Sequence, residues 1–190
     1  MARRGLARTQ KKARAERRTL LFVDESGFYL LPGRVKTYSP QGLTPVLYEW
    51  QTRDHLSVMA GLTRRGRLFT LVGDEALSAA ASAGFLARLR RRSRRKLLVI
   101  WDGSPIHRGR EVREFLAGGA GRRLHLEALP GYAPELNPVE GLWQHLKHVE
   151  LRNVVCLGLD HLREELRLAV ARLRHKVPLV RGFFGGAGLT

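Results

Sequence analysis

The sequence predicts an α/β fold in which helices flank a mixed sheet, an antiparallel meander continued by parallel strands. Three segments, 19–23, 97–101 and 124–129, are rich in apolar residues, which is typical of strands buried on both faces. Between the first two, strand-like segments separated by short turns indicate antiparallel neighbours. Helical periodicity separates the later strands, and a strand reached through a helix is most simply parallel to its neighbour.

The first strand and a hairpin are predicted near the N-terminus. The apolar segment 19–23 is followed at once by Asp24, where we expect the strand to end. Residues 34–38 and 45–50 flank the sequence SPQG at 39–42, whose proline and glycine favour a tight turn. A hairpin is therefore expected as an insertion after the first strand.

The next elements form the meander and a crossover. Segments 56–62 and 67–72 are predicted strands joined by a short turn. The stretch 75–92 is rich in alanine and leucine, with apolar residues at near-helical spacing. This pattern predicts a helix that begins near Glu75, where an acid suits the helix dipole. The helix leads to the second apolar strand, which ends at Asp102.

The C-terminal elements are mostly helical. Residues 109–117 predict a short helix before the strand at 124–129. Asn137 opens another helix with apolar side chains on one face, and Asp160 is expected to cap a last one. The glycine-rich stretch 182–188 is expected to be frayed.

The chain carries a large excess of positive charge. Its 190 residues include 34 Lys and Arg against 17 Asp and Glu, a formal net charge of +17. Such an excess indicates a polyanionic partner. With 44% hydrophobic residues, the composition is nevertheless that of a globular chain rather than a disordered basic tail.

Two segments hold most of this charge. Residues 1–18 contain eight basic residues and one acid, and residues 88–96 contain seven basic residues and no acid. Focused patches are typical of a footprint on a phosphate backbone, although a solvated tail and a solvated helix end would look alike. No sequence-reading helix is predicted beside them. The candidate DNA-binding residues are Lys11, Lys12, Arg91, Arg92, Arg94, Arg95 and Lys96.

Cysteine content and hydropathy restrict the class of protein further. Cys156 is the only cysteine, which excludes an internal disulfide and a cysteine-based zinc site. No stretch approaches the ~18 uninterrupted apolar residues of a membrane span. The basic start runs directly into a short apolar segment, unlike a secretory signal. A reducing, cytoplasmic setting is expected.

Three acids stand where a strand ends or a helix begins. Asp24 and Asp102 follow apolar strands, and Glu140 follows Asn137 and Pro138 at the start of a helix. Each has an ordinary explanation, because an aspartate in a turn binds backbone amides and Glu140 fits a capping box. In sheets of this kind, however, sites form beyond the carboxyl ends of the parallel strands. We therefore expect the three carboxylates to converge.

Converging carboxylates repel one another unless a cation holds them. Oxygen ligands without cysteine or histidine suit Mg²⁺ or Mn²⁺ better than Zn²⁺. Two such ions about 3.5–4 Å apart can activate an attacking oxygen and stabilise a leaving one at a scissile phosphate. The predicted cofactor is therefore Mg²⁺ or Mn²⁺, bound as two ions.

The sequence around each acid resembles one of the three signature blocks of DDE transposases. These are LLFVDESGF at 20–28, LLVIWDGSPIH at 97–107 and LPGYAPELNPVEGLW at 129–143. The similarity is greatest to the bacterial insertion-sequence branch beside the mariner elements, and it covers nearly everything after residue 18. In the second block Gly103 and Ser104 stand where Asn-Ala is more common, and the 37 residues between the last two acids slightly exceed the usual spacing.

This resemblance implies a ribonuclease-H-like fold, with Asp24, Asp102 and Glu140 as metal ligands and catalytic residues. It implies metal-dependent cleavage of double-stranded DNA at element ends, then transfer of the freed strand end to target DNA. Two alternatives stay open. One is another ribonuclease-H-like nuclease, such as a junction resolvase, and the other is an inactive, truncated transposase that only binds DNA non-specifically.

The resemblance also suggests how the chain is divided. We expect a basic arm at 1–18, the catalytic domain at 19–177 and a tail at 178–190. Relatives carry helix-turn-helix recognition modules upstream. A separate or fused N-terminal helix-turn-helix domain is therefore an expected partner, and a homodimer on DNA is a second candidate assembly.

Three neighbours of the acids are given other roles. Glu25 follows Asp24 and points to the opposite sheet face if the strand continues, which favours a structural role. His107 could contact a phosphate or orient a water, but a hydrogen-bonded structural histidine is favoured. Trp143 lies on an apolar helix face, which favours core packing over base stacking.

Overall fold

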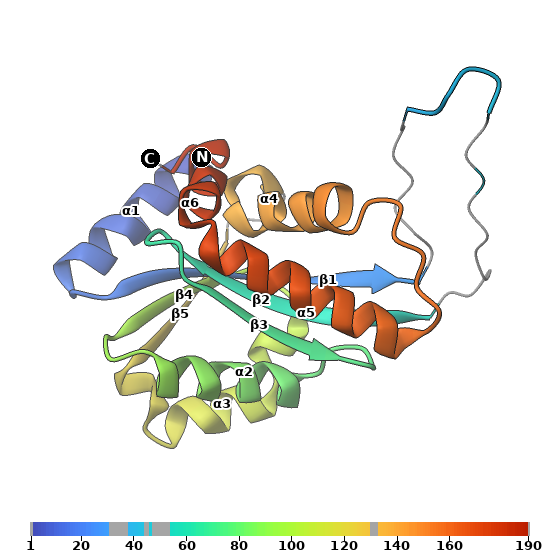
Figure 1. The fold of residues 1–190 in the computed structure, drawn as a ribbon. Helices are drawn as coiled ribbons and strands as arrows, with labels where there is room; N and C mark the ends of the chain where they lie inside the picture. Colours follow the sequence, from blue (N-terminus) through green and yellow to red (C-terminus); the bar gives the residue numbers. More distant parts are fainter. Residues whose placement is uncertain (1, 31–37, 44–45, 47–53, 130–132, 190) are drawn as a thin grey trace.

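The computed structural model of the chain describes residues 2–30, 38–43, 46, 54–129 and 133–189. Its sheet has five strands in the order β3-β2-β1-β4-β5 (Figure 1). The central strand β1 pairs antiparallel with β2 and parallel with β4, so the predicted mixed sheet is confirmed. The strands are β1 (Thr19–Tyr29), β2 (His55–Thr63), β3 (Leu68–Gly73), β4 (Leu97–Trp101) and β5 (Leu124–Ala128).

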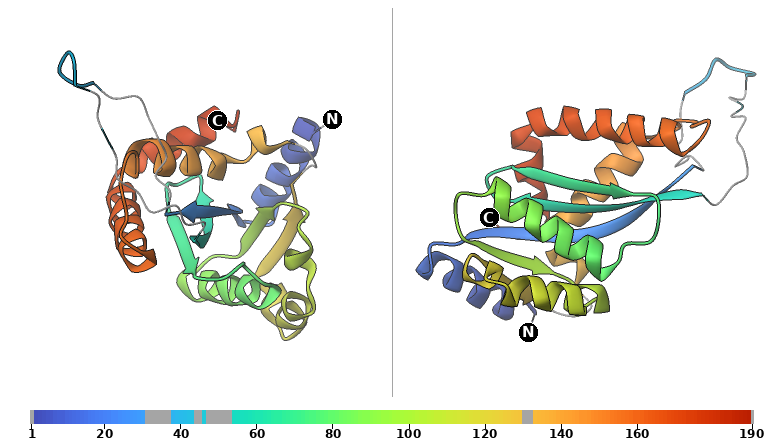
Figure 2. Two further views of the ribbon diagram at one scale, coloured as in Figure 1. Left: turned by 90° about the vertical axis from the view of Figure 1, so that its right-hand side faces the viewer. Right: turned by 90° about the horizontal axis from the view of Figure 1, so that it is seen from below.

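Helices cover both faces of this sheet. Two of them pack on one face, and the other four lie on the opposite side (Figures 1 and 2). The first group is α2 (Ala79–Arg92) and α3 (Arg110–Ala117); the second is α1 (Ala2–Ala15), α4 (Pro138–His145), α5 (Leu159–His175) and α6 (Val177–Gly186). The short elements are η1 (Pro105–Arg108), η2 (Ala120–Arg122), η3 (Pro134–Leu136) and the π-helical turn η4 (Leu146–Glu150), which continues α4.

Alternation along β1 decides which face each side chain joins. Leu21 and Val23 belong to the core beneath α2 and α3, whereas Phe22 belongs to the core beneath α4 and α5. Because successive residues of a strand face opposite ways, Asp24 lies on the α4 face and Glu25 on the α2 face. The second placement agrees with the orientation predicted for Glu25.

The prediction that the first strand ends at Asp24 is wrong. β1 continues to Tyr29, which pairs with His55, and Asp24 lies opposite Ala60 in the middle of the antiparallel ladder. The parallel ladder with β4 does stop earlier, at the pair Phe22 and Ile100. β2 reaches beyond β4 and supplies backbone partners that keep β1 extended.

Two predicted helix starts are also wrong. α2 begins at Ala79 rather than near Glu75, because the Ser78 side chain accepts a hydrogen bond from the Ala81 amide and caps the helix there. Helix α5 begins at Leu159, so Asp160 lies in its first turn instead of capping it. A serine at the N-cap position accepts a hydrogen bond from an amide that would otherwise be unpaired at the start of the helix. The acids upstream of Ser78 do not cap α2 in this way.

The predicted turn at 39–42 is confirmed, since the Leu43 amide donates to the Pro40 carbonyl at 3.0 Å and Gly42 has φ +85°. Such a φ favours glycine over residues with a Cβ. Apart from Tyr38 and Val46, the flanking strands predicted at 34–38 and 45–50 lie outside the described residues.

The C-terminal segment is ordered by packing rather than frayed, contrary to the prediction for 182–188. Helix α6 runs to Gly186 and buries Val180 and Phe184 in the core. It packs closely on α4, where a Cβ at Gly141 would lie only 3.0 Å from the Phe183 ring. The glycine in α4 therefore permits the contact that fixes α6 beside the start of α4.

The basic N-terminal segment is a helix. α1 buries Leu6 and Ala13 against the sheet, while Arg8, Lys11 and Arg14 are exposed. None of the helices in the described part of the chain is long and apolar enough to cross a membrane.

Candidate active site

The two aspartates lie at the same level on neighbouring strands. The last parallel pair is Phe22 with Ile100, and two residues further along each strand are Asp24 and Asp102. Adjacent strands are separated by about 4.8 Å. The register therefore places these two backbone positions on neighbouring strands at one level of the sheet.

Asp24 is a largely buried carboxylate held by an indole. Its Oδ2 accepts a hydrogen bond from Trp143 Nε1 at 3.0 Å. Burial raises the pKa of Asp24 to about 7, against the opposing effect of the Trp143 hydrogen bond and with further increases from the charges of Glu140 and Glu25. A buried acid beside other acids holds its proton until a cation offsets the repulsion.

Glu140 approaches the same site from the start of α4. Asn137 caps this helix, its side chain accepting from the Val139 amide at 3.1 Å. In a capping box Glu140 would accept the Asn137 amide hydrogen, but that amide donates to the Pro134 carbonyl at 2.8 Å. The half-buried Glu140 therefore does not form a capping box with Asn137. Its charge raises the pKa of both Asp24 and Lys147.

Asp102 is the most exposed of the three, with 49% of its side chain accessible. Its Oδ1 accepts from the Ser104 amide at 2.9 Å and lies 2.9 Å from His107 Nε2. His107 is buried, as expected of a structural histidine, and stacks on Trp101 at 3.9 Å between ring centroids. Among the described residues, neither ring nitrogen has a partner with hydrogen-bond geometry, so the expected hydrogen bonds are not found there.

Two further residues belong to this site and were missed or underestimated from the sequence. Trp143 does pack in the core, edge-on to Phe28, but its indole N–H also positions Asp24. Lys147 donates to Ser26 Oγ at 2.7 Å, and burial lowers its pKa while the charges of Glu140 and Asp24 raise it. The spacing of 140, 143 and 147 places all three on one helix face, a signal available in the sequence.

The raised pKa of Asp24 predicts how the metal-free protein responds to pH. The folded pKa of about 7 lies above the ordinary value of 3.8, so the stability that protonated Asp24 contributes is complete below about pH 4 and lost as pH rises toward 7. Asp24→Asn avoids this loss. In chelator at about pH 8, we expect it to raise the free energy of unfolding by up to about 4 kcal/mol.

Denaturant titrations of Asp24→Asn and wild type measure this difference at about pH 8 and about pH 4. The gain should shrink to a small fraction of its pH 8 value at the lower pH, where Asp24 is protonated in the folded state and about half protonated, at its ordinary pKa of 3.8, in the unfolded state. Asp160→Asn, at an exposed position in the first turn of α5, is the control. An equal gain at both pH values contradicts the assignment of the buried charge to Asp24.

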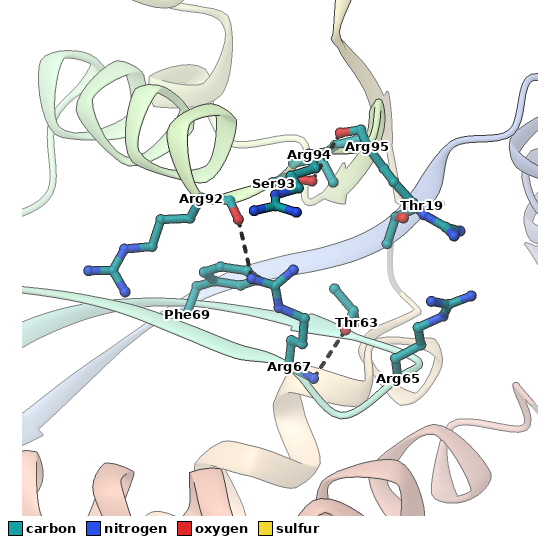
Figure 3. A pocket seen from close by; sticks show the side chains of 10 residues that line it. Thr19, Thr63, Arg65, Arg67, Phe69, Arg92, Ser93, Arg94 and Arg95 are labelled. Atoms are coloured by element: carbon teal, nitrogen blue, oxygen red, sulfur yellow. Dashed lines mark hydrogen bonds between the residues drawn. The ribbon is translucent and has the colours of Figure 1, made fainter.

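A groove lined by arginines lies at the opposite end of the sheet. It runs between the β2–β3 turn and the end of α2 as a pocket of about 300 Å³ (Figure 3), continued by a neighbouring pocket of about 370 Å³. Arg67 donates to the Arg92 carbonyl across it at 3.2 Å. We call this surface the arginine groove; its basic residues are Arg65, Arg67, Arg88, Arg92, Arg94, Arg95 and Arg174.

The arginine groove concentrates positive charge. Burial and the nearby charges of Arg88 and Arg92 lower the pKa of Arg174. The groove includes Thr19 at the start of β1, five residues from Asp24, or about 17 Å at 3.3 Å per residue. It is therefore distinct from the cluster of acids.

The predicted DNA-binding residues fall into different environments. Arg92, Arg94 and Arg95 line the arginine groove, and Arg91, Lys96 and Lys11 are exposed. Lys12 is instead engaged within the protein, 2.6 Å from Glu127 Oε1 and 2.7 Å from His125 Nε2. This ion pair lowers the pKa of Glu127 and leaves Lys12 less free to meet a phosphate than its neighbours.

The family called DDE superfamily endonuclease matches residues 19–155, most of the chain. The chain belongs to this family. As a DDE endonuclease domain, it has the mixed sheet flanked by helices that the resemblance of its three sequence blocks implied.

Relatives of this DDE endonuclease domain include proteins of mobile elements. An insertion element IS630 uncharacterized 39 kDa protein from Shigella sonnei is 32% identical over 117 residues, covering 60% of this chain and 32% of that protein. The Mos1 mariner paired end complex with Mn superposes with a TM-score of 0.64 at 21% identity, covering 98% of this chain and 60% of that one.

The isolated Mos1 transposase catalytic domain, solved with raltegravir and Mn, gives a TM-score of 0.55 at 19% identity over 96% of this chain and 88% of that one. These likenesses show that the DDE endonuclease domain has the fold of transposase catalytic domains. The domain spans about a third of the length of its IS630 relative and about three fifths of the Mos1 chain in the paired end complex.

Proposed function

We propose that this domain catalyses metal-dependent cleavage of DNA strands at the ends of an insertion element and then joins the freed 3′-hydroxyl to target DNA. The observation that carries the proposal is the buried Asp24 beside Glu140, in register with Asp102 on the neighbouring strand. Both reactions are in-line displacements at phosphorus, so one set of carboxylates serves both. An inactive transposase that only binds DNA would not need a buried pair of acids that repel each other.

The proposed metal ligands are Asp24, Asp102 and Glu140, with Mg²⁺ or Mn²⁺ as the ions. The donor set fits, because carboxylate oxygens are preferred by both cations. Burial, and to a lesser extent the charges of Glu140 and Glu25, raise the pKa of Asp24, and a bound cation would stabilise its charged form. Solved Mos1 complexes contain Mn or Mg. When bound, such ions activate the attacking oxygen and stabilise the leaving one.

The protein's own groups prepare this site. Trp143 fixes the Asp24 carboxylate through its indole N–H, which limits how far Asp24 can turn. Lys147 brings an ammonium group near Glu140 and Asp24, where it can contact a phosphate oxygen of the strand that is cut. The buried side of the site, formed by α4 and β1, excludes water from behind these groups.

The test is nicking of supercoiled plasmid and of duplex bearing the element's terminal repeat, in Mg²⁺, in Mn²⁺ and in chelator. We expect strand cleavage with either metal, 3′-hydroxyl ends and no reaction in chelator. A folded protein that binds DNA but cuts neither substrate with either metal would support the non-catalytic alternative and overturn the proposal.

Lys147 provides an independent check on the catalytic face. Lys147→Met keeps much of the stem but loses the ammonium group, and we expect cleavage to slow by at least about tenfold, the lower end for a lost charged contact. Lys147→Arg should restore part of the rate. Arg152→Met removes an exposed charge nearby in sequence and should have little effect. A wild-type rate for Lys147→Met rejects the contact.

We propose double-stranded DNA as the partner, with the arginine groove contacting the phosphate backbone. Its positive charge lies about 17 Å from the acids along β1, so it would hold DNA away from the scissile phosphate. Such contacts carry no sequence information. Recognition of element ends is therefore assigned to a helix-turn-helix domain, fused or separate, and a dimer on DNA is consistent with the paired end complexes of Mos1. The bacterial cytoplasm is the proposed setting.

A further inference from the structure

Glu25, Asp102 and His107 form a second cluster of metal-ligating atoms, on the α2 side of β1. One ligand atom from each lies within 4.8 Å of the others. His107 Nε2 is 2.9 Å from Asp102 Oδ1 and 3.2 Å from Glu25 Oε1. Asp24 and Glu140 are not members, so the cluster differs from the proposed catalytic set in two of its three residues.

The cluster contains buried polar atoms that lack hydrogen bonds. Only 1% of the His107 side chain is exposed, and Nε2, Nδ1 and Glu25 Oε1 have no hydrogen-bond partner within the described residues. A buried polar atom without a partner costs about 1–3 kcal/mol. A protonated imidazole would donate along its N–H direction, but the carboxylate oxygens lie off that direction. A simple ion pair therefore does not account for the arrangement.

Two of the three separations in the cluster match those of ligands around one small cation. Two cis ligands at about 2.0–2.1 Å from an ion in octahedral geometry are about 2.9–3.0 Å apart, and tetrahedral ligands about 3.4 Å. The observed 2.9 and 3.2 Å fall in this range. Stacking on Trp101 at an interplanar angle of 13° holds the imidazole ring in place.

One side of the cluster borders a pocket of about 480 Å³, which is lined by Asp102, His107 and Trp101 beside α3. Asp102 Oδ1 also accepts from the Ser104 amide, and Arg108, another lining residue, donates to the Gly103 carbonyl. Glu25 does not line this pocket, and its Oε1 and both His107 ring nitrogens are buried. An ion therefore approaches from the side of Asp102, the exposed member of the cluster.

We propose that Glu25, Asp102 and His107 bind one divalent transition metal ion, such as Mn²⁺ or Zn²⁺, at a site that shares Asp102 with the catalytic carboxylates but does not use Asp24 or Glu140. The imidazole selects these ions over Mg²⁺ and Ca²⁺, which prefer oxygen ligands. Because Asp102 belongs to both sets, an ion bound here draws its carboxylate toward His107. The site does not rest on the proposed function, since it is defined without DNA or catalysis.

The experiment uses Mn²⁺ and the full chain carrying Asp24→Asn and Glu140→Gln, which removes two of the three proposed catalytic ligands and keeps Asp102. We expect one bound Mn²⁺, with nitrogen hyperfine coupling in pulsed EPR that reports imidazole coordination. Adding His107→Gln should abolish the coupling, while His148→Gln, at an exposed histidine, should leave it intact. Glu25→Gln should weaken Mn²⁺ binding at least tenfold but keep the coupling.

The double variant decides the matter even where His107→Gln does not fold. Mn²⁺ bound without nitrogen coupling, or no bound Mn²⁺, overturns the site. Coupling that survives in a folded His107→Gln protein, or that His148→Gln abolishes, assigns the nitrogen to another histidine and also overturns it. Competition by Mg²⁺ as strong as that by Zn²⁺ contradicts the proposed selectivity.

Discussion

Asp102→Asn is expected to lower the rate of metal-dependent DNA cleavage by about 10³-fold or more, while DNA affinity stays equal or rises slightly. The substitution preserves side-chain size and removes a charge that holds a cation, and loss of such electrostatic stabilisation typically costs at least 10²–10³ in rate. DNA affinity should not fall, because removing a negative charge reduces repulsion of phosphate.

Cleavage assays and binding titrations on the same preparations separate these two effects. Glu140→Gln should lose activity to a similar extent. Because Glu140 is not part of the cluster of Glu25, Asp102 and His107, this loss reports on the catalytic carboxylates alone. Glu135→Gln removes an acid that is exposed in η3 and should cleave at the wild-type rate. Wild-type cleavage by either Asp102→Asn or Glu140→Gln would show that the carboxylates are wrongly assigned.

Binding of duplex DNA is expected to weaken by roughly 10³–10⁵ between 50 and 200 mM salt if the protein contacts about 6–10 phosphates. The arginine groove is the proposed source of several of these contacts. Replacing Arg92, Arg94 and Arg95 with serine should reduce the slope of log affinity against log salt by about 2.7, since each lost contact contributes about 0.9. The backbone carbonyl of Arg92 still accepts from Arg67.

A matched triple variant distinguishes local contacts from overall charge. Arg113, Arg152 and Arg181 are exposed and do not line the groove, so their replacement by serine removes the same charge elsewhere. Its slope should change much less. At low salt, where the groove variant is saturated with DNA, its cleavage rate should equal that of wild type, because the acids lie about 17 Å away along β1. Equal slopes for the two triple variants would reject the groove.

Several features of the fold are predictable because their signals are local. The five strands of the sheet and the turn at 39–42 follow from short apolar segments and from proline and glycine. The start of α4 follows from Asn137 and Pro138, which act within one turn of the helix. Asp24 and Asp102 lie at the same level because each is the same number of residues from the first pair of the parallel ladder, Thr19 and Leu97.

The errors arise where a distant part of the chain decides. β1 continues beyond Asp24 because β2 pairs with β1 as far as His55. No pattern within residues 19–30 indicates this pairing. The segment 182–188, rich in glycine, was expected to fray but is helical to Gly186, because Phe183 meets Gly141 and Phe184 enters the core. Burial in a shared core outweighs the low helix propensity of glycine.

The sequence by itself determined which acids lie at the ends of the apolar segments and at the start of the helix, and that positive charge is focused in two segments, because these properties belong to neighbouring residues. Only the tertiary structure decided what each side chain meets. It set the Trp143 indole on Asp24, turned Asp102 toward His107 and joined Arg65 and Arg67 to Arg92, Arg94 and Arg95 in one groove. Asp24 and Trp143, like Arg67 and Arg92, lie far apart in sequence, so their contacts depend on sheet order and helix packing, which no short window contains.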